Sequence, residues 1–314
     1  MPDPDLSRWA RPAAILVATD LSDLDRLLPF AVQQASQTGA RLFLLHVIAG
    51  AEAVSADLSG MPYYDPIGAF ETVTRALESC CIEARRKNIR CDVIVREGNA
   101  ARQILTAARQ FSADCILLGT RGRGKLTRLV LGSVAEQVLR SVNLPVITVG
   151  PEAHREVVDS APQRVVLHAT TLSEASRPSA VLACRLASQL NAKLMLLHVL
   201  PHMEDMKRKG LPTGLDSAAM QQLRQMAAEI SSSGLSVEPQ VAHGNPSIEI
   251  LAKASELQAS LIVLGAAERS PFDNLTRDRT VYKVLAHARC PVLTLRETST
   301  HEEGLHLAHT ALHS

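Results

Sequence analysis

The sequence predicts an α/β protein made of two successive units, each a five-stranded parallel sheet with helices on both faces. Short runs that are apolar throughout alternate with longer stretches of helical periodicity, a pattern typical of parallel strands buried on both sides. The order of these segments repeats after about 150 residues, close to one domain length. The 314 residues are enough for two such domains, each with its own core.

The composition restricts the kinds of partner. Apolar residues make up 46% of the chain and aromatic residues only 3%, so the cores must be aliphatic. The formal net charge of +1 argues against a nucleic-acid partner or a polybasic membrane surface. The apolar runs are far shorter than the roughly 20 residues of a membrane span, and the first residues lack the layout of a signal peptide. We therefore expect a cytoplasmic protein without membrane insertion, whose partners are small molecules or proteins.

Five apolar segments of the first half are interpreted as its strands. The first ends in Asp20, and the helical pattern after it has Ser22 placed to cap its start and Gly39 to end it. A long loop rich in small residues, Gly and Pro is expected over residues 49–67. Further helices are expected over about 70–87, about 101–110 and from 134 onward, and the expected strands are residues 13–20, 42–47, 91–95, 115–118 and 145–149.

The first unit is organised around the stretch from Ala113 to Leu139. Its apolar run ends at Gly119, and Gly132 and Ser133 stand where the next helical pattern begins. A helix N-terminus offers unpaired N–H groups and the positive end of the helix dipole, and a glycine there lets an anion approach the backbone closely. We interpret this stretch as a seat for phosphate, although an ordinary strand-to-helix loop is the structural alternative.

The same residues allow a competing interpretation as a P-loop, because 119–125 also read G-x-x-x-x-G-K. A P-loop needs Ser or Thr directly after its lysine to hold Mg²⁺ and should open a helix at once. Here Leu126 follows Lys125, and the helical pattern begins only near Gly132. The P-loop is therefore the weaker interpretation.

The second half repeats the first in order. Residues 164–173, 194–200, 242–251, 259–268 and 290–295 match 13–22, 42–48, 96–105, 113–122 and 144–149. A linker with two prolines, Gly150 to Gln163, separates the halves. We expect one domain over residues 1–150, a second over 164–297 and a tail over 298–314.

Five features recur in the two halves or mark the first, and together they resemble a tandem universal stress protein. They are D-L-S after the first strand, L-H-V at the second, G-N at the third, G-x2-G-x9-G-S after the fourth and P-V at the fifth. The resemblance covers nearly the whole chain. It implies flavodoxin-like or Rossmann-like (adenine nucleotide α-hydrolase-like) domains with the strands in the flavodoxin-like order. The ligand would lie in the crevice at the carboxyl ends of the strands.

The resemblance also implies an ATP site, with or without Mg, in the first unit. Asp20 would accept hydrogen bonds from the nucleoside, while the backbone of Thr19 and Val47 and the side chain of Leu118 would frame the adenine. Ser133 would donate its hydroxyl to the phosphates. The phosphates would be surrounded by Gly119, Gly122, Gly132, Ser133 and Val134, with positive charge nearby from Arg121, Arg123, Lys125 and Arg128.

The second unit departs from this pattern. Thr171 stands where the first unit has Asp20, and the loop glycines 122 and 132 are replaced by Glu268 and Asp278. Arg279 takes the place of Ser133. Because two acids repel phosphate and the lost glycines close the backbone approach, we expect no ATP in this unit.

No set of catalytic residues is visible, since the sequence shows no nucleophile elbow and no acid paired with a Mg²⁺-binding hydroxyl. The leading hypothesis is a stress-response regulatory or signalling protein that acts through nucleotide-dependent conformation or partner binding, with at most slow ATP hydrolysis. The alternatives are an ATP-dependent enzyme of the adenine-nucleotide α-hydrolase-like group and a structural interaction protein with nucleotide as scaffold.

Cysteine and histidine usage gives no metal site. The six cysteines contain no C-x-x-C pair, so we expect free buried thiols. His46 and His198 occupy matching positions, which favours a structural role. The tail is expected to be a mobile or docking tail and not a metal ligand set, although it carries His301, His306, His309 and His313.

The fifth strand of each unit should be an edge of its sheet, and an exposed apolar edge invites aggregation unless it is covered. We expect the two fifth strands, from Pro145 to Val149 and from Cys290 to Leu295, to cover each other through a pseudo-two-fold contact. Single-unit members of the resembled family pair through this strand. A homodimer through remaining apolar surface and an unknown protein partner are further expectations.

Overall fold

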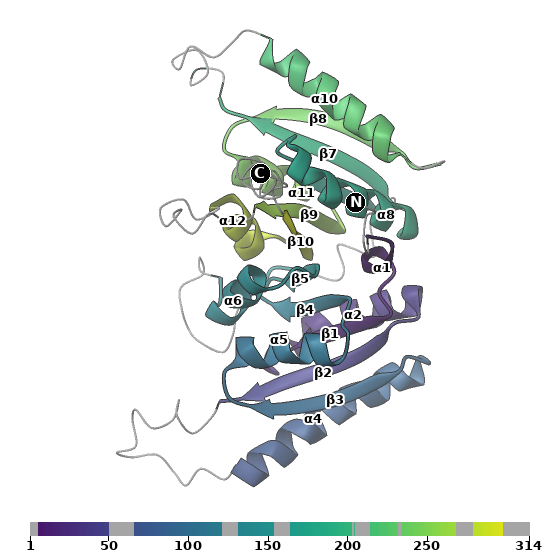
Figure 1. Cartoon of the computed structure of the whole chain (residues 1–314), viewed down its shortest axis with the longest axis vertical. Coiled ribbons are helices and arrows are strands. Elements are labelled where there is room, and N and C mark those ends of the chain that lie inside the picture. The colour runs from purple at the N-terminus through teal and green to yellow at the C-terminus, as the bar shows by residue number, and fades with distance from the viewer. Residues whose placement is uncertain are drawn as a thin grey trace, which may run out of the picture.

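The computed structural model describes residues 6–49, 66–120, 131–153, 164–202, 204, 214–231, 234–267 and 279–297. Its ten strands form one continuous sheet in the order β3-β2-β1-β4-β5-β10-β9-β6-β7-β8. The two units follow one another along the long axis of the molecule, with β5 and β10 in the middle and α4 and α10 at opposite ends (Figure 1).

The first unit contains β1 to β5, and all its strand pairs are parallel. Its strands are β1 (Ala14–Ala18), β2 (Arg41–Ile48), β3 (Cys91–Glu97), β4 (Cys115–Gly119) and β5 (Val146–Val149). Its helices are α1 (Leu6–Ala10), α2 (Leu24–Thr38), α4 (Pro66–Arg86), α5 (Ala100–Gln110) and α6 (Ser133–Ser141).

The second unit contains β6 to β10, again with parallel pairs only. Its strands are β6 (Val165–Ala169), β7 (Lys193–Leu200), β8 (Val237–His243), β9 (Leu261–Ala267) and β10 (Val292–Glu297). Its helices are the short η1 (Glu174–Ser176), then α8 (Arg177–Gln189), α10 (Leu215–Ile230), α11 (Pro246–Glu256) and α12 (Arg279–His287).

The strand order confirms the α/β fold class and corrects one detail. Each unit has the order 3-2-1-4-5, which is the Rossmann-like arrangement; the flavodoxin-like order 2-1-3-4-5 that we expected is wrong. The second and third strands both lie on one side of the first because the chain winds twice in that direction before it crosses to the fourth. The fifth strand is still at the edge of its unit.

Matching turns show that the duplication extends to backbone detail. Asn99 and Asn245 cap α5 and α11, and each side chain accepts a hydrogen bond from a backbone N–H of its helix. The G-N pair of each unit is therefore a helix start. Positive φ angles also recur, at Leu21 (76°) and Leu172 (62°) after the first strands.

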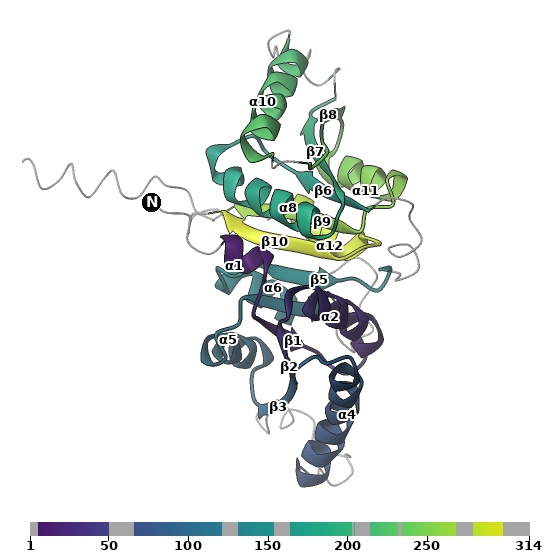
Figure 2. The same ribbon diagram turned by 90° about the vertical axis from the view of Figure 1, so that its right-hand side faces the viewer.

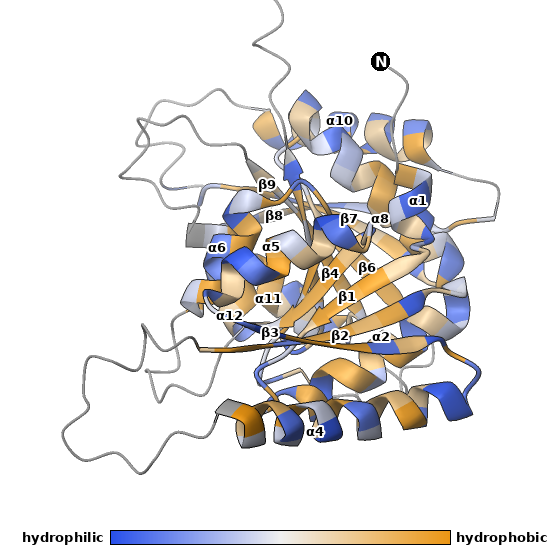
Figure 3. Ribbon diagram, turned by 60° about the horizontal axis from the view of Figure 1, so that its bottom comes forward, coloured by the Kyte–Doolittle hydropathy of each residue, from blue (hydrophilic) through white to orange (hydrophobic). Residues whose placement is uncertain are grey.

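Two hydrophobic cores run along the two faces of the sheet and through both units. One packs α1, α2, α4, α8 and α10 against the strands, with Leu27, Leu77, Leu182 and Leu223 fully buried. The other packs α5, α6, α11 and α12 on the opposite face. Figure 3 shows the strands β1, β2, β4 and β6 as predominantly hydrophobic between helices of mixed hydropathy. Each core is almost entirely aliphatic, as the composition predicts.

The two units join through their fifth strands, which confirms the predicted edge-to-edge contact. β5 and β10 run antiparallel, with Ile147 opposite Leu293. Two threonines tie the ladder reciprocally, because Thr148 Oγ1 donates to the Val292 carbonyl at 3.3 Å and Thr294 Oγ1 donates to the Val146 carbonyl at 3.2 Å. Between α6 and α12, Arg140 Nε donates to the Tyr282 hydroxyl at 3.2 Å.

Helix α1 is an element that the sequence analysis did not predict. It belongs to the chain before β1 but packs against α8 of the second unit, at the junction of β5 and β10 (Figure 2). Leu6 and Ala10 are buried, and Arg185 donates to the Ser7 hydroxyl at 2.9 Å. Arg8 pairs with the buried Asp114 of the first unit. The helix therefore bridges the two units on one face.

Helix starts differ from the prediction at two places. α2 begins at Leu24 with Asp23 at the N-cap, so the prediction of Ser22 as the cap is wrong; Ser22 is used by the turn before the helix. Gly39 ends α2 as predicted, with φ 76°. α4 begins at Pro66 rather than near residue 70, because proline suits the first turn of a helix. Most of the predicted loop over 49–67 and the tail histidines lie outside the described residues.

The prediction of free thiols is wrong for two of the six cysteines. Cys81 on α4 and Cys91 at the start of β3 form a disulfide. A turn through Asn88, with φ 61°, folds the end of the helix back onto the strand and brings the two side chains together.

Within the parts of the chain that the structure describes, every helix is too short or too polar to cross a lipid bilayer.

Candidate functional site

The carboxyl edge of the first unit contains the switch point of its sheet, between β1 and β4. From β1 the chain continues to β2 and β3 on one side, while β4 and β5 lie on the other. Ala18 is opposite Leu118 in the parallel register, so Thr19, just after β1, and Gly119, the last residue of β4, lie side by side. Crevices that receive ligands in open α/β sheets form at such a point.

The turn after β1 leaves one carboxylate oxygen without a donor. Asp20 Oδ1 accepts from the Ser22 backbone N–H at 2.9 Å and from the Ser22 hydroxyl at 2.6 Å. Asp20 Oδ2 is shielded from solvent and has no hydrogen-bond partner among the described residues. A buried acceptor without a donor costs free energy, so the turn has an atom ready to receive a hydroxyl or N–H group from a ligand. Asp20 Oδ1 thus accepts the hydrogen bonds of the turn, and Oδ2 is available to a donor from a ligand.

Thr19 and His46 hold this turn in place. Thr19 Oγ1 accepts from the Leu21 N–H at 2.9 Å, which fixes the positive φ of Leu21, and donates to Asp23 at 2.5 Å. His46 Nδ1 lies 2.8 Å from the Thr19 carbonyl oxygen, across the gap between β2 and β1. The sequence predicted a structural role for His46, and the structure identifies the group it bonds.

Asp23 is a buried carboxyl group whose pKa is raised to about 6. Burial is the main cause, the nearby charge of Asp20 adds to it, and the hydrogen bond from Thr19 opposes it. A raised pKa means that the folded state holds the proton more tightly than the unfolded state, so this contribution to stability is present at low pH and is lost as pH rises through 6.

Replacing the Asp23 carboxyl group by an amide tests this predicted change of stability with pH. We expect Asp23→Asn to gain stability relative to the wild type as pH rises from 4 to 7, because the amide keeps the acceptor for Thr19 without a buried charge. Urea unfolding across this pH range measures the difference. Asp25→Asn, at an exposed position of the same helix, is the control. An Asp23→Asn difference that stays constant with pH would contradict the raised pKa.

The connection from β4 to α6 is closed at both of its described ends. The Gly132 N–H donates to the Thr120 carbonyl at 2.8 Å, and the Thr120 N–H donates to the Val149 carbonyl at 3.2 Å. Gly132 is the N-cap of α6, and Ser133 and Val134, the first helical residues, are exposed. The first N–H groups of the helix have no partner within it, which makes this end suited to an anion.

The other predicted site residues divide into those on this edge and those outside the described residues. Val47, at the end of β2, is half-buried and packs on the same core as Leu118. Leu118 is only 3% exposed, so its side chain forms part of the core beneath this edge of the sheet. The positive charges and one glycine of the predicted phosphate seat lie outside the described residues: Arg121, Gly122, Arg123, Lys125 and Arg128. The competing P-loop falls largely on the same residues.

The second unit keeps the scaffold of this turn but not its acid. Thr171 Oγ1 lies 2.9 Å from the Ser173 hydroxyl, as Asp20 bonds Ser22, and His198 Nδ1 lies 2.9 Å from the Thr170 carbonyl oxygen. Arg279 is the first residue of α12, as Ser133 is of α6. Glu268 and Asp278 lie outside the described residues. A neutral hydroxyl therefore replaces the carboxylate at the matching switch point.

The strand order and the repeated elements together define a duplicated Rossmann-like α/β protein whose two sheets are fused through their fifth strands. A sequence model of the universal stress protein family matches residues 13–150 and 163–296. The chain belongs to the universal stress protein family, in tandem form.

Similar proteins agree with this assignment. A universal stress protein of Mycolicibacterium smegmatis is 26% identical over 296 residues, which cover 90% of this chain and 96% of that protein. Universal stress protein YxiE of Bacillus subtilis is 30% identical over 144 residues and matches 43% of this chain and 97% of its own length. The crystal structure of a universal stress protein from Archaeoglobus fulgidus aligns with a TM-score of 0.70 at 24% identity, covering 91% of this chain and 99% of that one. The last comparison supports the fold.

Proposed function

We propose that the first unit binds one ATP at its carboxyl edge and that the chain acts as a regulatory or signalling protein in the stress response, through nucleotide-dependent conformation or partner binding. The observation that carries this proposal is the buried Asp20 Oδ2, which has no hydrogen-bond partner among the described residues. It lies at the switch point of a Rossmann-like sheet, beside a strand-to-helix connection of the type that receives phosphate.

Each part of the crevice supplies one part of nucleotide recognition. Asp20 accepts hydrogen bonds from the nucleoside, and the backbone of Thr19 and Val47 lies along the adenine. The phosphates occupy the N-terminus of α6, where Ser133 donates its hydroxyl and the helix N–H groups carry partial positive charge. The loop cations, Arg121 among them, add charge that favours an anionic ligand, and Mg accompanies the phosphates if it is present.

Several further features belong to the same proposal. We infer that residues 1–150 and 164–297 form two successive domains and that 298–314 form a tail. The two matched segments of the family model support the division into two domains. We also infer a cytoplasmic protein that dimerises, with a protein partner that reads the nucleotide state. Hydrolysis of ATP, where it occurs, is a slow by-product.

Titration calorimetry with ATP is expected to give one site per chain. The reason is the retained acid in the first unit and the neutral Thr171 in the second. Gly122→Glu, which copies the second unit's residue, should weaken binding at least tenfold, about 1.4 kcal/mol, because it places a carboxylate against phosphate. Thr171→Ala is the matched control in the second unit and should leave affinity unchanged. A stoichiometry of two equal sites per chain would contradict the predicted difference between the units. An unchanged ATP affinity of Gly122→Glu would show that the loop does not hold the nucleotide.

A further inference from the structure

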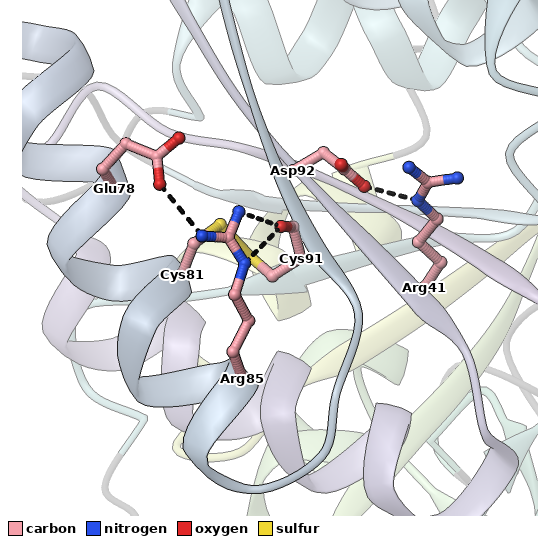
Figure 4. Close-up of a disulfide and its surroundings, with 6 residues drawn as sticks. All are labelled: Arg41, Glu78, Cys81, Arg85, Cys91 and Asp92. Atoms are coloured by element: carbon pink, nitrogen blue, oxygen red, sulfur yellow. Dashed lines mark hydrogen bonds and ion pairs between the residues drawn. A yellow bond between two sulfur atoms is a disulfide. The ribbon is translucent and has the colours of Figure 1, made fainter.

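The disulfide of the first unit joins a helix to the outermost strand of the sheet. Cys81 lies on α4 and Cys91 is the first residue of β3, ten residues later, with Cα atoms 5.2 Å apart (Figure 4). Both residues are buried, at 0% and 3% exposure. β3 has a neighbouring strand on one side only, since it ends the strand order. The bond therefore fastens an edge that otherwise depends on β2 and α4.

The second unit makes the same contact without sulfur. Ala227 on α10 and Val237 at the start of β8 stand at the positions of Cys81 and Cys91, and Gly234, with φ 86°, stands at the position of Asn88. Ala227 is buried like its counterpart. Since α10 and β8 pack in the same way, the fold does not require a covalent bond here. The disulfide is an addition to an apolar contact that is sufficient without it.

A guanidinium group is hydrogen-bonded to the backbone of Cys91. Arg85 donates to the Cys91 carbonyl oxygen from Nε at 3.1 Å and from Nη2 at 2.6 Å, and Nη1 bonds Glu78 at 3.2 Å (Figure 4). The thiolate is the form of a cysteine that reacts in thiol–disulfide exchange. The position of Arg85 in the second unit is Ser231, so this cation accompanies the cysteine pair alone.

The other four cysteines lack these features. Burial raises the pKa of Cys115 and of Cys290 to about 12, so neither forms a thiolate in neutral solution. Cys184 Sγ donates to the Ile230 carbonyl oxygen at 2.8 Å. Burial and the charge of Glu83 raise the pKa of Cys80, which disfavours its thiolate although it adjoins Cys81. Cys81 and Cys91 are thus the cysteines that the structure joins, and the other four remain thiols.

We propose that Cys81 and Cys91 form a reversible redox site whose reactant is a low-molecular-weight disulfide. One cysteine thiolate attacks the small disulfide, forming a mixed disulfide and releasing one small thiol. The second cysteine then attacks the mixed bond, forming the Cys81–Cys91 bond and releasing the second small thiol. The two cysteines lose two electrons and two protons, which the small disulfide takes up as two thiols. The small thiol drives the reverse reaction, and access is by local opening of the edge strand.

Oxidation fixes α4 to β3, and reduction leaves an apolar contact like that of the second unit. Closing a loop between the two cysteines restricts the unfolded chain, so the oxidised protein should be the more stable form. This site lies at the amino end of β3, whereas the candidate nucleotide crevice lies at the carboxyl edge of the sheet. The redox site therefore stands independently of the proposed nucleotide binding.

The test equilibrates the full chain with glutathione and glutathione disulfide over a range of ratios, then denatures it in acid and counts alkylated cysteines by mass spectrometry. The expected result is six modified cysteines in reducing buffer and four in oxidising buffer, with peptide mapping that identifies Cys81 and Cys91 as the protected pair. The melting temperature should rise by about 5 °C on oxidation.

Two variants make the assignment specific. Cys81→Ala with Cys91→Val copies the second unit, so this double variant should fold and should lose both the change in count and the shift in melting temperature. Cys80→Met, which copies Met226, should retain both. Six modified cysteines at every ratio would overturn the proposal, as would protection of any other pair or a stable glutathione adduct on Cys80. Absence of ATP binding by both the oxidised and the reduced protein would count against the proposed nucleotide binding and not against the redox site.

Discussion

Lysine at both Val146 and Leu293 is expected to separate the two units while leaving each of them folded. Both side chains are 2% exposed, on the two strands that form the junction. A buried ammonium group without a partner costs several kcal/mol, and the cost falls if the junction opens and the side chain reaches water. Small-angle scattering should show a radius of gyration larger by several ångströms, with the helical circular dichroism signal retained.

A control for this variant uses a position of the same chain that is already in water. Ile248→Lys on α11 adds one lysine at a residue that is 61% exposed, and its scattering profile should match the wild type. If the double-lysine variant also keeps the compact profile, contacts other than the β5–β10 ladder hold the units together. Helix α1 and the Arg140–Tyr282 bond would then be the elements responsible.

His168→Val is expected to remove a loss of stability that the wild type suffers in mild acid. His168 is fully buried in β6, and its Nδ1 lies 3.0 Å from the Val263 carbonyl oxygen. Because a carbonyl only accepts, Nδ1 carries the proton, and Nε2 is left buried without a partner among the described residues. The first unit has Val17 at the matching position, so the strand accommodates valine there.

The expected loss of stability in acid follows from the lowered pKa of His168. Burial lowers this pKa from 6.5 to about 4, and the bond to Val263 opposes the change. Between pH 6.5 and 4 the imidazole of His168 is therefore protonated in the unfolded chain but neutral in the folded chain. The stability of the folded state falls as pH drops through this range. At about 1.4 kcal/mol per pH unit, the wild type should lose about 2 kcal/mol relative to His168→Val between pH 7 and pH 5.

Urea unfolding of both proteins at several pH values measures this difference. The comparison must be between variant and wild type at each pH, because Asp23 changes stability in the opposite direction over an overlapping range and is common to both. His202→Gln, at an exposed position, is the control. A difference between His168→Val and wild type that does not change with pH would show that His168 is not the group that titrates.

Much of the fold could be predicted because local chemistry carried the information. Gly39 ends a helix because it adopts a left-handed conformation easily, and Gly132 with Ser133 opens one, as predicted. The paired fifth strands followed from the edge problem of any open sheet. The flavodoxin-like order failed because apolar runs show that strands exist but not on which side of its neighbour each one lies.

The candidate site was predicted only in part, because residue types and spacing carry local information but do not show contacts. The sequence pointed to Asp20, but only the contacts show that one of its oxygens serves the turn and the other has no donor. Asp23 instead of Ser22 precedes the first residue of α2, and its side chain makes no cap hydrogen bond. Ser22 donates to Asp20 in the turn that contains Leu21 with its positive φ. The side chain of Leu118 belongs to the core, which the strand pattern already implied.

The sequence by itself determined that the chain is a duplicated α/β protein, where its strands and most helices lie, and which unit retains the acid of the candidate crevice. These properties depend on periodicity, caps and residue identity, which are local. The tertiary structure alone decided the Cys81–Cys91 pairing, the bridge made by α1 and the burial of His168 Nε2 without a partner among the described residues. Each of these depends on which surfaces meet after the chain has folded, and neither spacing nor composition specifies that meeting.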